Sequence, residues 1–403
     1  MVDFALTDRE LEIQRIAEEF TQQYVTPYAL DLDAKNEFPH DVVQKAHELK
    51  LTNLHVPREL GGPERTMLEE TLVGEAIGYG CVGVATSIMT NNLALAPLLM
   101  GCQEDQLKKY VTPLVTSDKY QIVSFCLTER GAGSDAAAVA TRAVQEGDEY
   151  VINGMKCFIT GAPVASLMTV FASTDPEARH KGISCFIVPA DTPGVSIGHI
   201  ENKMGQKASV QSEVHFKDVH VPTECLVGNE GDGFRISMMT LDMTRASIAS
   251  MATGLAQRAL DEAARFANLR QQFGKPIGRF QGISFMLSDM ACRTEASRLL
   301  SRHAAWLADK KIRNTKESAF AKYYASDSAM QNALDAVQIL GGYGYMVEYP
   351  TEKLVRDAKL LQIYEGTNQI QQVVAGGQIL KESTLDKKTG FKLDYKGKDG
   401  PQI

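Results

Sequence analysis

Several features are scarce or missing in this chain of 403 residues, and each absence excludes a class of protein. Its seven cysteines are scattered, form no C-x-x-C pair and are odd in number. We therefore expect neither a disulfide framework nor a metal site, and a reducing compartment fits best. Acidic residues outnumber basic ones, which gives a formal net charge of −8. Nucleic-acid binding normally requires a clustered basic face, so we expect no nucleic-acid partner.

Targeting and membrane signals are also missing. The first residues, Met1 to Phe4, show neither a basic segment followed by an apolar run nor an Arg-rich amphipathic leader. No stretch reaches the roughly 18 apolar residues that a membrane span requires. We therefore expect a soluble protein without a membrane span, located in the cytoplasm, or in an organelle matrix if a leader has been removed.

What is present divides the chain into three regions of different periodicity. Residues 7 to about 118 have helical spacing, and Thr7 with a glutamate three residues later predicts a capping box. From about 120 to 230, short β-rich runs separated by turn residues predict a small barrel or sandwich. The helical signal returns after Gly233, and a long helix is expected to stop at Gly341.

This order predicts an α+β protein in three parts. We expect a helical domain over residues 1–120, a β domain over 121–232, a helical bundle over 233–385, and an extended tail over 386–403. The order differs from the alternating βαβ pattern of a nucleotide-binding sheet.

Two glycine-rich segments are candidates for cofactor binding. Residues 131–135 (Gly-Ala-Gly-Ser-Asp) follow a predicted strand, a setting that suits a phosphate group. They lack the third glycine and the βαβ setting of a dinucleotide fingerprint, so the residues alone favour an ordinary loop. Residues 341–344 (Gly-Gly-Tyr-Gly) could either stop a helix or contact a cofactor.

Two further segments carry residues suited to catalysis or to phosphate binding. In residues 363–370, Glu365 precedes a glycine, which allows close backbone approach beside an acid, as a general base requires. The same segment could simply begin a helix capped by Thr367 or Asn368. Residues 270–274 (Arg-Gln-Gln-Phe-Gly) could bind a phosphate or form a solvated helix end.

Five separated blocks together resemble the acyl-CoA dehydrogenase family, and the resemblance runs from about residue 3 to residue 382. In the family's order, the blocks are Leu127-Thr128-Glu129-x-Gly131-Ala132-Gly133-Ser134-Asp135, Phe158-Ile159-Thr160, Arg270-x-x-Phe273-Gly274, Gln338-Ile339-Leu340-Gly341-Gly342 and Tyr364-Glu365-Gly366-Thr367. Each block is weak alone, but their order and spacing are specific. The chain is most similar to the short- and medium-chain members. The resemblance implies an N-terminal α domain, a middle β-barrel and a C-terminal four-helix bundle.

The resemblance also implies an FAD-dependent enzyme that oxidises an acyl-CoA to the enoyl-CoA. Glu365 would take the α-proton, and the β-hydride would pass to flavin N5. Burial beside an apolar acyl chain would raise the pKa of Glu365 toward neutrality. The backbone N–H of Glu365 and a flavin ribityl hydroxyl would stabilise the charge that develops on the thioester oxygen.

The resemblance assigns cofactor contacts as well. Thr128 and Thr160 would hydrogen-bond the flavin ring, Phe158 would pack beside it, and Ser134 would lie between the cofactor pyrophosphate and the CoA. Further contacts near the ring are implied at Phe125, Leu127 and Gly133. Contacts to the FAD of a neighbouring subunit are implied at Arg270, Gln272, Phe273, Gln281, Gln338, Gly341 and Gly342, with Thr367 and Gln369 completing that site.

Substrate contacts are expected at Ser134, Asp242, Arg245, Tyr364, Gly366 and Asn91. The stretch Met89 to Asn92, expected near the far end of the acyl pocket, is polar for such a place. Unpaired polar groups there would cost a long aliphatic tail roughly 1–3 kcal/mol each. This favours a short or medium, branched or cyclic acyl group. Alternatively, these side chains bond each other or the backbone.

The chain departs from the family pattern at three positions. Arg130 stands where the family usually has proline, which would change the rigidity of the loop or add a phosphate contact. Phe158 replaces a common tryptophan and keeps an aromatic face. Thr244 occupies the position where long-chain and isovaleryl members carry their base, and the absence of an acid there strengthens the assignment of the base to Glu365.

The resemblance further implies an electron-transfer flavoprotein as electron acceptor and a homo-oligomer, in the form of a tetramer. Two other functions stay open. A flavin oxidase on the same fold would pass its electrons to oxygen. A non-catalytic homologue would serve as a binding or assembly subunit, although the presence of Glu365 argues against it.

Overall fold

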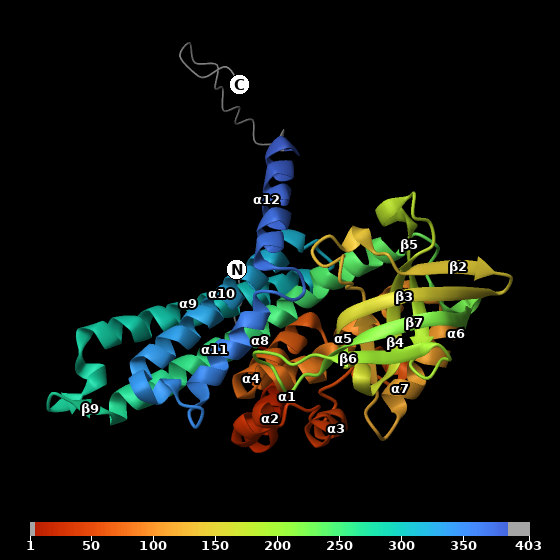
Figure 1. The fold of residues 1–403 in the computed structure, drawn as a ribbon. Coiled ribbons are helices and arrows are strands. Elements are labelled where there is room, and N and C mark those ends of the chain that lie inside the picture. The colour runs from red at the N-terminus through yellow and green to blue at the C-terminus, as the bar shows by residue number, and fades with distance from the viewer. Residues whose placement is uncertain (1–4, 386–403) are drawn as a thin grey trace, which may run out of the picture.

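The computed structural model describes residues 5–385 and shows helices, then strands, then helices again (Figure 1). The first helices are α1 (Asp8–Phe20), α2 (Ala29–Lys35), α3 (His40–Glu48), α4 (Met67–Gly80), α5 (Val82–Gly101), α6 (Glu104–Tyr110) and α7 (Thr112–Thr116). The strands are β1 (Ile122–Cys126), β2 (Arg142–Glu146), β3 (Glu149–Thr160), β4 (Ala165–Ser173), β5 (Ile183–Pro189), β6 (Val195–Ile200), β7 (Gln211–Pro222) and β8 (Leu226–Val227). The last region holds α8 (Gly233–Leu269), the short pair β9 (Gln271–Gln272) and β10 (Lys275–Pro276), α9 (Gln281–Asp309), α10 (Thr315–Leu340), α11 (Pro350–Leu361) and α12 (Asn368–Leu385). The expected α+β fold is confirmed.

The predicted capping box at the start of α1 is present. The Thr7 hydroxyl accepts a hydrogen bond from the Glu10 N–H at 3.3 Å, and the Glu10 carboxylate accepts one from the Thr7 N–H at 2.7 Å. The two groups therefore satisfy two N–H donors that the first helical turn would leave unpaired.

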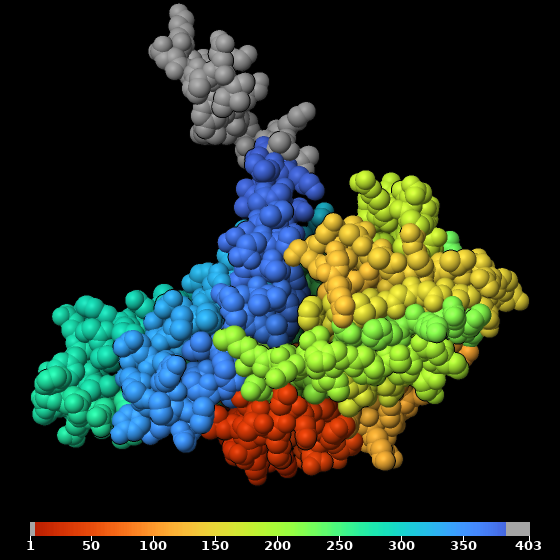
Figure 2. All heavy atoms as spheres, viewed as in Figure 1, coloured from red at the N-terminus to blue at the C-terminus, as the bar shows by residue number. Residues whose placement is uncertain are grey.

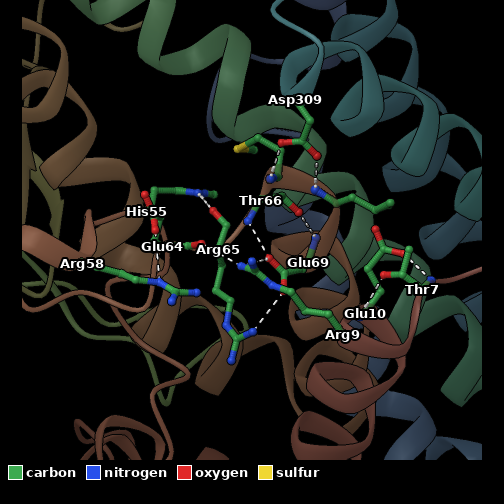
Figure 3. A network of polar contacts seen from close by, with 12 residues as sticks. Thr7, Arg9, Glu10, His55, Arg58, Glu64, Arg65, Thr66, Glu69 and Asp309 are labelled. Carbon is green, nitrogen blue, oxygen red and sulfur yellow. Dashed lines mark hydrogen bonds and ion pairs between the residues drawn. The ribbon is translucent and has the colours of Figure 1, made fainter.

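The start of α4 joins three parts of the chain through a network of polar contacts (Figure 3). Thr66 and Glu69 form a second capping box, and Arg9 of α1 pairs with Glu69 at 2.7 Å. Asp309, at the end of α9, accepts hydrogen bonds from the N–H groups of Met67 and Leu68 at 2.7 and 3.0 Å. A carboxylate at a helix N-terminus is favourable because the N–H donors there have no partner inside the helix. The network fixes the N-terminal helices to the C-terminal bundle.

The strands form one mixed sheet of eight, in the order β6-β7-β3-β2-β4-β5-β8, with β1 paired to β4. A tight turn joins β2 and β3, and Gly147 takes a φ of 61° there. β1 runs parallel to β4. The loop that follows β1 lines a cavity together with residues of α5 and α8, so it lies at the junction of the three regions.

Helix α5 is the core helix between the N-terminal helices and the sheet. It is the one helix among residues 5–385 that is long and apolar enough to span a membrane, and 89% of its most apolar window is buried inside the protein. This helix corrects the expectation that no segment is long and apolar enough for a membrane span. Ile88 packs with the N-terminal and bundle helices, and Leu95 packs against the sheet, so α5 is apolar on all sides because it separates two cores.

The C-terminal bundle is built around α8, which packs on α4, α9 and α10. At its crossing with α4, a Cβ on Gly254 would lie 2.1 Å from the Glu75 carbonyl oxygen, so only glycine permits this approach. α10 ends at Leu340 before Gly341, as predicted. α12 projects from the body beside the β region (Figures 1 and 2). The domain boundaries expected near residues 120, 232 and 385 remain predictions, and the expected tail 386–403 lies outside the described residues.

Candidate active site

A cavity of about 350 Å³ lies where the three regions meet. Its walls come from α5, the loop after β1, the end of β3, α8, and the turn between α11 and α12. Eleven of the residues predicted from the sequence line it: Phe125, Leu127, Thr128, Gly133, Ser134, Phe158, Thr160, Arg245, Tyr364, Glu365 and Gly366. The remaining wall is largely apolar and includes Met89, Leu93, Phe234, Met238, Ile248 and Met251. The fold therefore gathers side chains from separate segments around one space.

Glu365 lies in the wall of this cavity, at the turn between α11 and α12. Its φ of 51° is in the left-handed region, which is uncommon for a residue with a side chain. Thr244 Oγ1 on α8 donates a hydrogen bond to Glu365 Oε2 at 2.7 Å. Burial raises the pKa of Glu365 to about 7, although the Thr244 hydrogen bond and the charges of Arg245 and Lys322 act to lower it. A carboxyl group with such a pKa is suited to act as a general base at neutral pH.

The backbone of this turn presents free donors. Among residues 5–385, the N–H groups of Glu365 and Gly366 donate no hydrogen bond, whereas both carbonyls accept one from Gln371 Nε2 at 3.1 Å. N–H groups fixed in this way can stabilise negative charge that develops on a bound oxygen. The predicted role of the Glu365 N–H is therefore compatible with the geometry of the turn.

Arg245 is a buried guanidinium in the same wall. Its Nη1 donates to Asp242 Oδ1 at 2.6 Å, and Asp242 Oδ2 accepts from the Thr315 hydroxyl at 2.6 Å. Burial lowers the pKa of Arg245, and the charges of Asp242 and Glu365 oppose that effect. Asp242 itself is not in the cavity wall, so the structure places it behind Arg245, where it orients the guanidinium.

Another part of the cavity wall, formed by Thr128, Phe158 and Thr160 and called the slot below, suits a planar ring. Phe158 is 62% exposed and has a φ of 58°, and it stands beside Thr160 at the end of β3. Thr160 Oγ1 accepts a hydrogen bond from Gln211 Nε2 at 3.1 Å, which leaves the Thr160 proton free to donate. With the Thr128 hydroxyl, the wall combines an aromatic face and polar groups at a few points. This donor set fits the isoalloxazine ring of FAD.

A buried ion pair shapes the loop over this slot. Lys156 Nζ donates to Glu129 Oε1 at 2.6 Å and to the Leu127 carbonyl at 3.1 Å. The other side of the Glu129 carboxylate accepts from the N–H groups of Ala140 and Thr141 at 2.7 and 3.0 Å. Burial alone would raise the pKa of Glu129, but the charge and hydrogen bonds of Lys156 and the loop lower it. The pair therefore closes the loop between residues 129 and 141.

The other predicted cofactor residues lie elsewhere in the subunit. Arg270, Gln272, Gly341 and Gly342 line a second hollow of about 470 Å³, where the Arg270 guanidinium lies 5.6 Å from the centre of the Tyr343 ring. Three further predicted cofactor contacts are exposed near this end of the bundle: Phe273, Gln281 and Gln338. Figure 1 places β9, which adjoins Arg270, at the opposite end of the bundle from the start of α12. The predicted cofactor contacts thus form two separate groups within one subunit.

Thr367 and Gln369 lie at the start of α12, beside the first group. The Thr367 hydroxyl accepts a hydrogen bond from the Ile370 N–H at 3.2 Å. Thr367 therefore caps α12, which was one of the two alternatives for this segment. Gln369 is exposed. Neither residue lines the cavity.

The expected substrate contact at Asn91 is corrected by the structure. Asn91 is buried outside the cavity wall, where its Nδ2 donates to Asn53 Oδ1 and the Gln121 carbonyl, each at 2.7 Å. Its Oδ1 accepts from the Val123 N–H at 2.9 Å. The alternative interpretation, in which these polar side chains bond each other or the backbone, describes Asn91. Asn92 follows the same pattern, with its Oδ1 accepting from the Leu54 N–H at 2.9 Å.

Two residues that contact Glu365 or its turn, Thr244 and Lys322, were not among the predicted site residues. At position 244 the sequence indicates only that the acid of other family members is absent. Nothing in the neighbouring residues indicates that Thr244 forms a hydrogen bond with Glu365, 121 positions further along the chain. Lys322 is buried on α10 and donates to the Gly366 carbonyl at 2.8 Å. Lys322 lies three residues from both Ala319 and Ala325, which are buried on the same helix, and this spacing is a signal that could have found it.

Comparison with known proteins shows what this arrangement is similar to. Models of the N-terminal, middle and C-terminal domains of acyl-CoA dehydrogenase match residues 7–118, 124–219 and 231–380. The chain is 43% identical over 370 residues to the mitochondrial short-chain specific acyl-CoA dehydrogenase of Rattus norvegicus, across 92% of this chain and 89% of the relative. The solved butyryl-CoA dehydrogenase of Megasphaera elsdenii has a TM-score of 0.91 and 39% identity, and the match covers 94% of this chain and 100% of that one. A chain from a structural study of the electron transferring flavoprotein of Acidaminococcus fermentans has a TM-score of 0.92 and 39% identity, with coverage of 94% and 100%.

Proposed function

Because this chain belongs to the acyl-CoA dehydrogenase family, we propose that Glu365 is the base of its reaction and that its acyl group is short or medium in length. The chain is an FAD-dependent oxidoreductase that acts on the CH–CH bond of an acyl-CoA. The observation that carries the proposal is the position of the Glu365 carboxylate in the wall of the cavity, beside two free N–H groups.

The chemistry requires such an arrangement. A C–H group next to a thioester is a weak acid, so a base must take its proton while donors stabilise the charge on the thioester oxygen. Glu365 supplies the carboxylate, and its own N–H is one of the free donors of the turn. Arg245 keeps a positive charge near the carboxylate, which favours the ionised form of the base. Bound FAD supplies the acceptor for the hydride that leaves the β carbon.

The FAD ring is proposed to lie in the slot formed by Thr128, Phe158 and Thr160. The Thr160 proton is free to hydrogen-bond the ring, and Phe158 offers an aromatic face for stacking. The loop that the Glu129–Lys156 pair closes carries Ser134 to the cavity wall, where its hydroxyl would bind a phosphate or the CoA.

The size and lining of the cavity support a short or medium acyl group. At about 350 Å³ the cavity must hold the acyl chain together with the reactive ends of both ligands. Met89, Met238 and Met251 line it, and flexible thioether side chains adapt to irregular shapes. We therefore include branched and cyclic groups in the proposal. The polar residues Asn91 and Asn92 do not favour a branched or cyclic acyl group, because both side chains are hydrogen-bonded inside the protein.

We propose a homotetramer in which a neighbouring subunit completes each FAD site. The group around Arg270 is too far along the bundle to reach the cavity of its own subunit (Figure 1). Large apolar side chains are exposed on the bundle, among them Phe285, Trp306, Val373 and Leu380. Such a surface is typical of a subunit interface.

The proposed electron acceptor is an electron-transfer flavoprotein, since the similar chain of Acidaminococcus fermentans comes from a study of that protein. The relatives named mitochondrial suggest the matrix as one location, and the cytoplasm is the other. In either compartment the seven cysteines would remain reduced.

The test is an anaerobic titration of the FAD-loaded protein with linear, branched and cyclic acyl-CoAs, followed by the visible flavin band. We expect rapid bleaching by short or medium acyl groups, and no bleaching in Glu365→Gln. Bleaching only by long linear acyl-CoAs would overturn the proposed substrate class. Unchanged bleaching in Glu365→Gln would overturn the proposed base, and peroxide formation at the turnover rate in air would make the protein an oxidase.

A further inference from the structure

Lys322 on α10 is a buried lysine that has no carboxylate within ion-pair distance in the described part of the chain. Three lysines among residues 5–385 are buried, and two of them form ion pairs, Lys156 with Glu129 and Lys353 with Asp357. Lys322 has no exposed surface, and within the described residues it forms no ion pair. A buried ammonium without a paired carboxylate is costly, so a structure that keeps one requires an explanation.

The hydrogen bonds of Lys322 are directed at the turn that carries Glu365. Lys322 Nζ donates to the Gly366 carbonyl at 2.8 Å and to Asn368 Oδ1 at 3.0 Å. Asn368 is held in turn, because its Nδ2 donates to the Tyr323 carbonyl at 3.3 Å and its Oδ1 accepts from the Ser326 hydroxyl at 3.1 Å. The ammonium therefore ties the residue after the base, and the first residue of α12, to α10.

The turn needs such support because its backbone is strained. Glu365 has a φ of 51° in the left-handed region, and a residue with a side chain stays there only when its surroundings determine the conformation. Gln371 Nε2 donates to the carbonyls of Glu365 and Gly366, each at 3.1 Å. Lys322 is the second group on the Gly366 carbonyl, and it is the charged one. Both carbonyls are thus engaged, whereas within the described part of the chain the N–H groups of Glu365 and Gly366 donate no hydrogen bond.

The charge of Lys322 also acts on the carboxylate of the base. Lys322 and Arg245 both lower the pKa of Glu365, against the larger raising effect of burial. Burial in turn lowers the pKa of Lys322, and the nearby Glu365 carboxylate opposes that effect. The charge of Arg245 acts together with burial, so the pKa of Lys322 falls to about 7, whereas Asp327 on α10 itself favours the charged form. Glu70 in turn raises the pKa of Glu365.

We propose that Lys322 is a positioning residue for the base, which fixes the Gly366 carbonyl and supplies the buried positive charge that Glu365 faces. This inference rests on the proposed role of Glu365. The two parts of the role have separate consequences. Fixing the turn orients the carboxylate and the free N–H groups toward the thioester, so its loss lowers the plateau rate of flavin reduction. The charge keeps the carboxylate ionised, so its loss moves the acid limb of the pH profile.

Two variants separate these consequences. Lys322→Met removes the donor and the charge, whereas Lys322→Gln keeps an N–H donor, on a side chain one bond shorter, without the charge. We expect both to move the acid limb of flavin reduction upward by about one pH unit, the effect of losing a nearby opposite charge. We expect the plateau rate at high pH to fall by about 10-fold in Lys322→Met, the effect of a lost hydrogen bond to the turn, and by less in Lys322→Gln.

The matched control is Lys316→Met on the same helix, where the ammonium pairs with Glu382 at 2.6 Å. It should leave both the acid limb and the plateau unchanged. The measurement is stopped-flow reduction of the bound flavin by a saturating acyl-CoA between pH 5.5 and 9, on protein whose FAD content and melting temperature are recorded. A merely structural role of Lys322 would lower the melting temperature of the variants but would not move the acid limb of the pH profile.

The inference is overturned if FAD-loaded Lys322→Gln keeps the parent's acid limb and Lys322→Met, where it folds, keeps the parent's plateau. If Lys322→Met does not retain FAD, the acid limb of Lys322→Gln decides by itself. The proposed function fails in a different way, through a Glu365→Gln variant that is still reduced at the parent's rate. An inactive Glu365→Gln together with unaltered Lys322 variants would leave the base in place and remove only the role of Lys322.

Discussion

The hydroxyl of Thr244 donates a 2.7 Å hydrogen bond to the carboxylate of Glu365, although 121 residues separate the two in the chain. The bond joins the long helix α8 to the turn between α11 and α12. The bond is stronger to the ionised carboxylate, because a protonated carboxyl group is a poorer acceptor. Burial favours the neutral form of the proposed base, whereas the Thr244 hydrogen bond and the charges of Arg245 and Lys322 favour the charged form.

Removing this hydrogen bond should raise the pKa of Glu365. In Thr244→Val we expect the acid limb of flavin reduction to move upward by about one pH unit, since a hydrogen bond to a charged group contributes roughly 1.5–3 kcal/mol and one unit corresponds to about 1.4 kcal/mol. Thr244→Ser keeps the hydroxyl and should restore the parent's profile. The same limb in Thr244→Val and the parent would show that the hydrogen bond does not control the base.

The parent protein should itself show an acid limb near neutrality. The pKa of Glu365 is raised to about 7, so the fraction of carboxylate, the form that accepts the α-proton, grows as the pH rises through that value. Below the pKa we expect the rate of flavin reduction to increase about tenfold per pH unit, and above it the rate should level off. A profile that is flat from pH 5.5 to 8 would contradict a base with a raised pKa.

Replacing the base should abolish chemistry without releasing FAD. We expect Glu365→Gln to lower the rate of flavin reduction by about 10²–10⁴-fold, the contribution of a positioned general base. The amide is close to the carboxylate in shape, so acyl-CoA should still bind and perturb the flavin spectrum. Loss of FAD from Glu365→Gln would show that the side chain supports the structure instead.

The Glu129–Lys156 pair should be a large contributor to stability. Lys156→Met leaves the buried Glu129 carboxylate without its charged partner, and breaking a buried pair in this way costs about 3–5 kcal/mol of the free energy of unfolding. Arg15→Met breaks the exposed pair between Arg15 and Glu19 and should have no measurable effect. Chemical denaturation measures the free energy of unfolding of both variants. Equal losses in Lys156→Met and Arg15→Met would contradict a large contribution of the buried pair.

The separation of the two groups of cofactor residues makes oligomerisation testable through FAD. Arg270 lies at the far end of the bundle from the cavity, so Arg270→Ala should weaken FAD binding by about 10–100-fold only if a neighbouring subunit brings it to the cofactor. Arg265→Ala is the matched control on α8, where Arg265 lies 3.6 Å from Glu262. FAD release on dilution, followed by flavin fluorescence, measures the effect. Equal retention by both variants would argue against a shared site.

Much of the fold follows from local sequence. The Thr7 capping box, the turn at Gly147 and the end of α10 before Gly341 are each determined by residues within a few positions of one another. Periodicity over longer windows separates the helical regions from the strands, because burial on one face imposes a period of 3.6 or 2. Glu365 and Thr160 could also be predicted from the sequence, since they lie in short blocks whose order and spacing resemble a family.

The sequence by itself therefore determined the order of the three regions, the caps and turns, and the acid that faces the cavity. Only the tertiary structure decided that Thr244 bonds Glu365, that Lys322 is buried against the Gly366 carbonyl, and that Asn91 turns away from the cavity. The physical reason is distance along the chain. Local propensity acts over one or two helical turns, whereas these contacts depend on how α5, α8, α10 and the turn before α12 pack on one another.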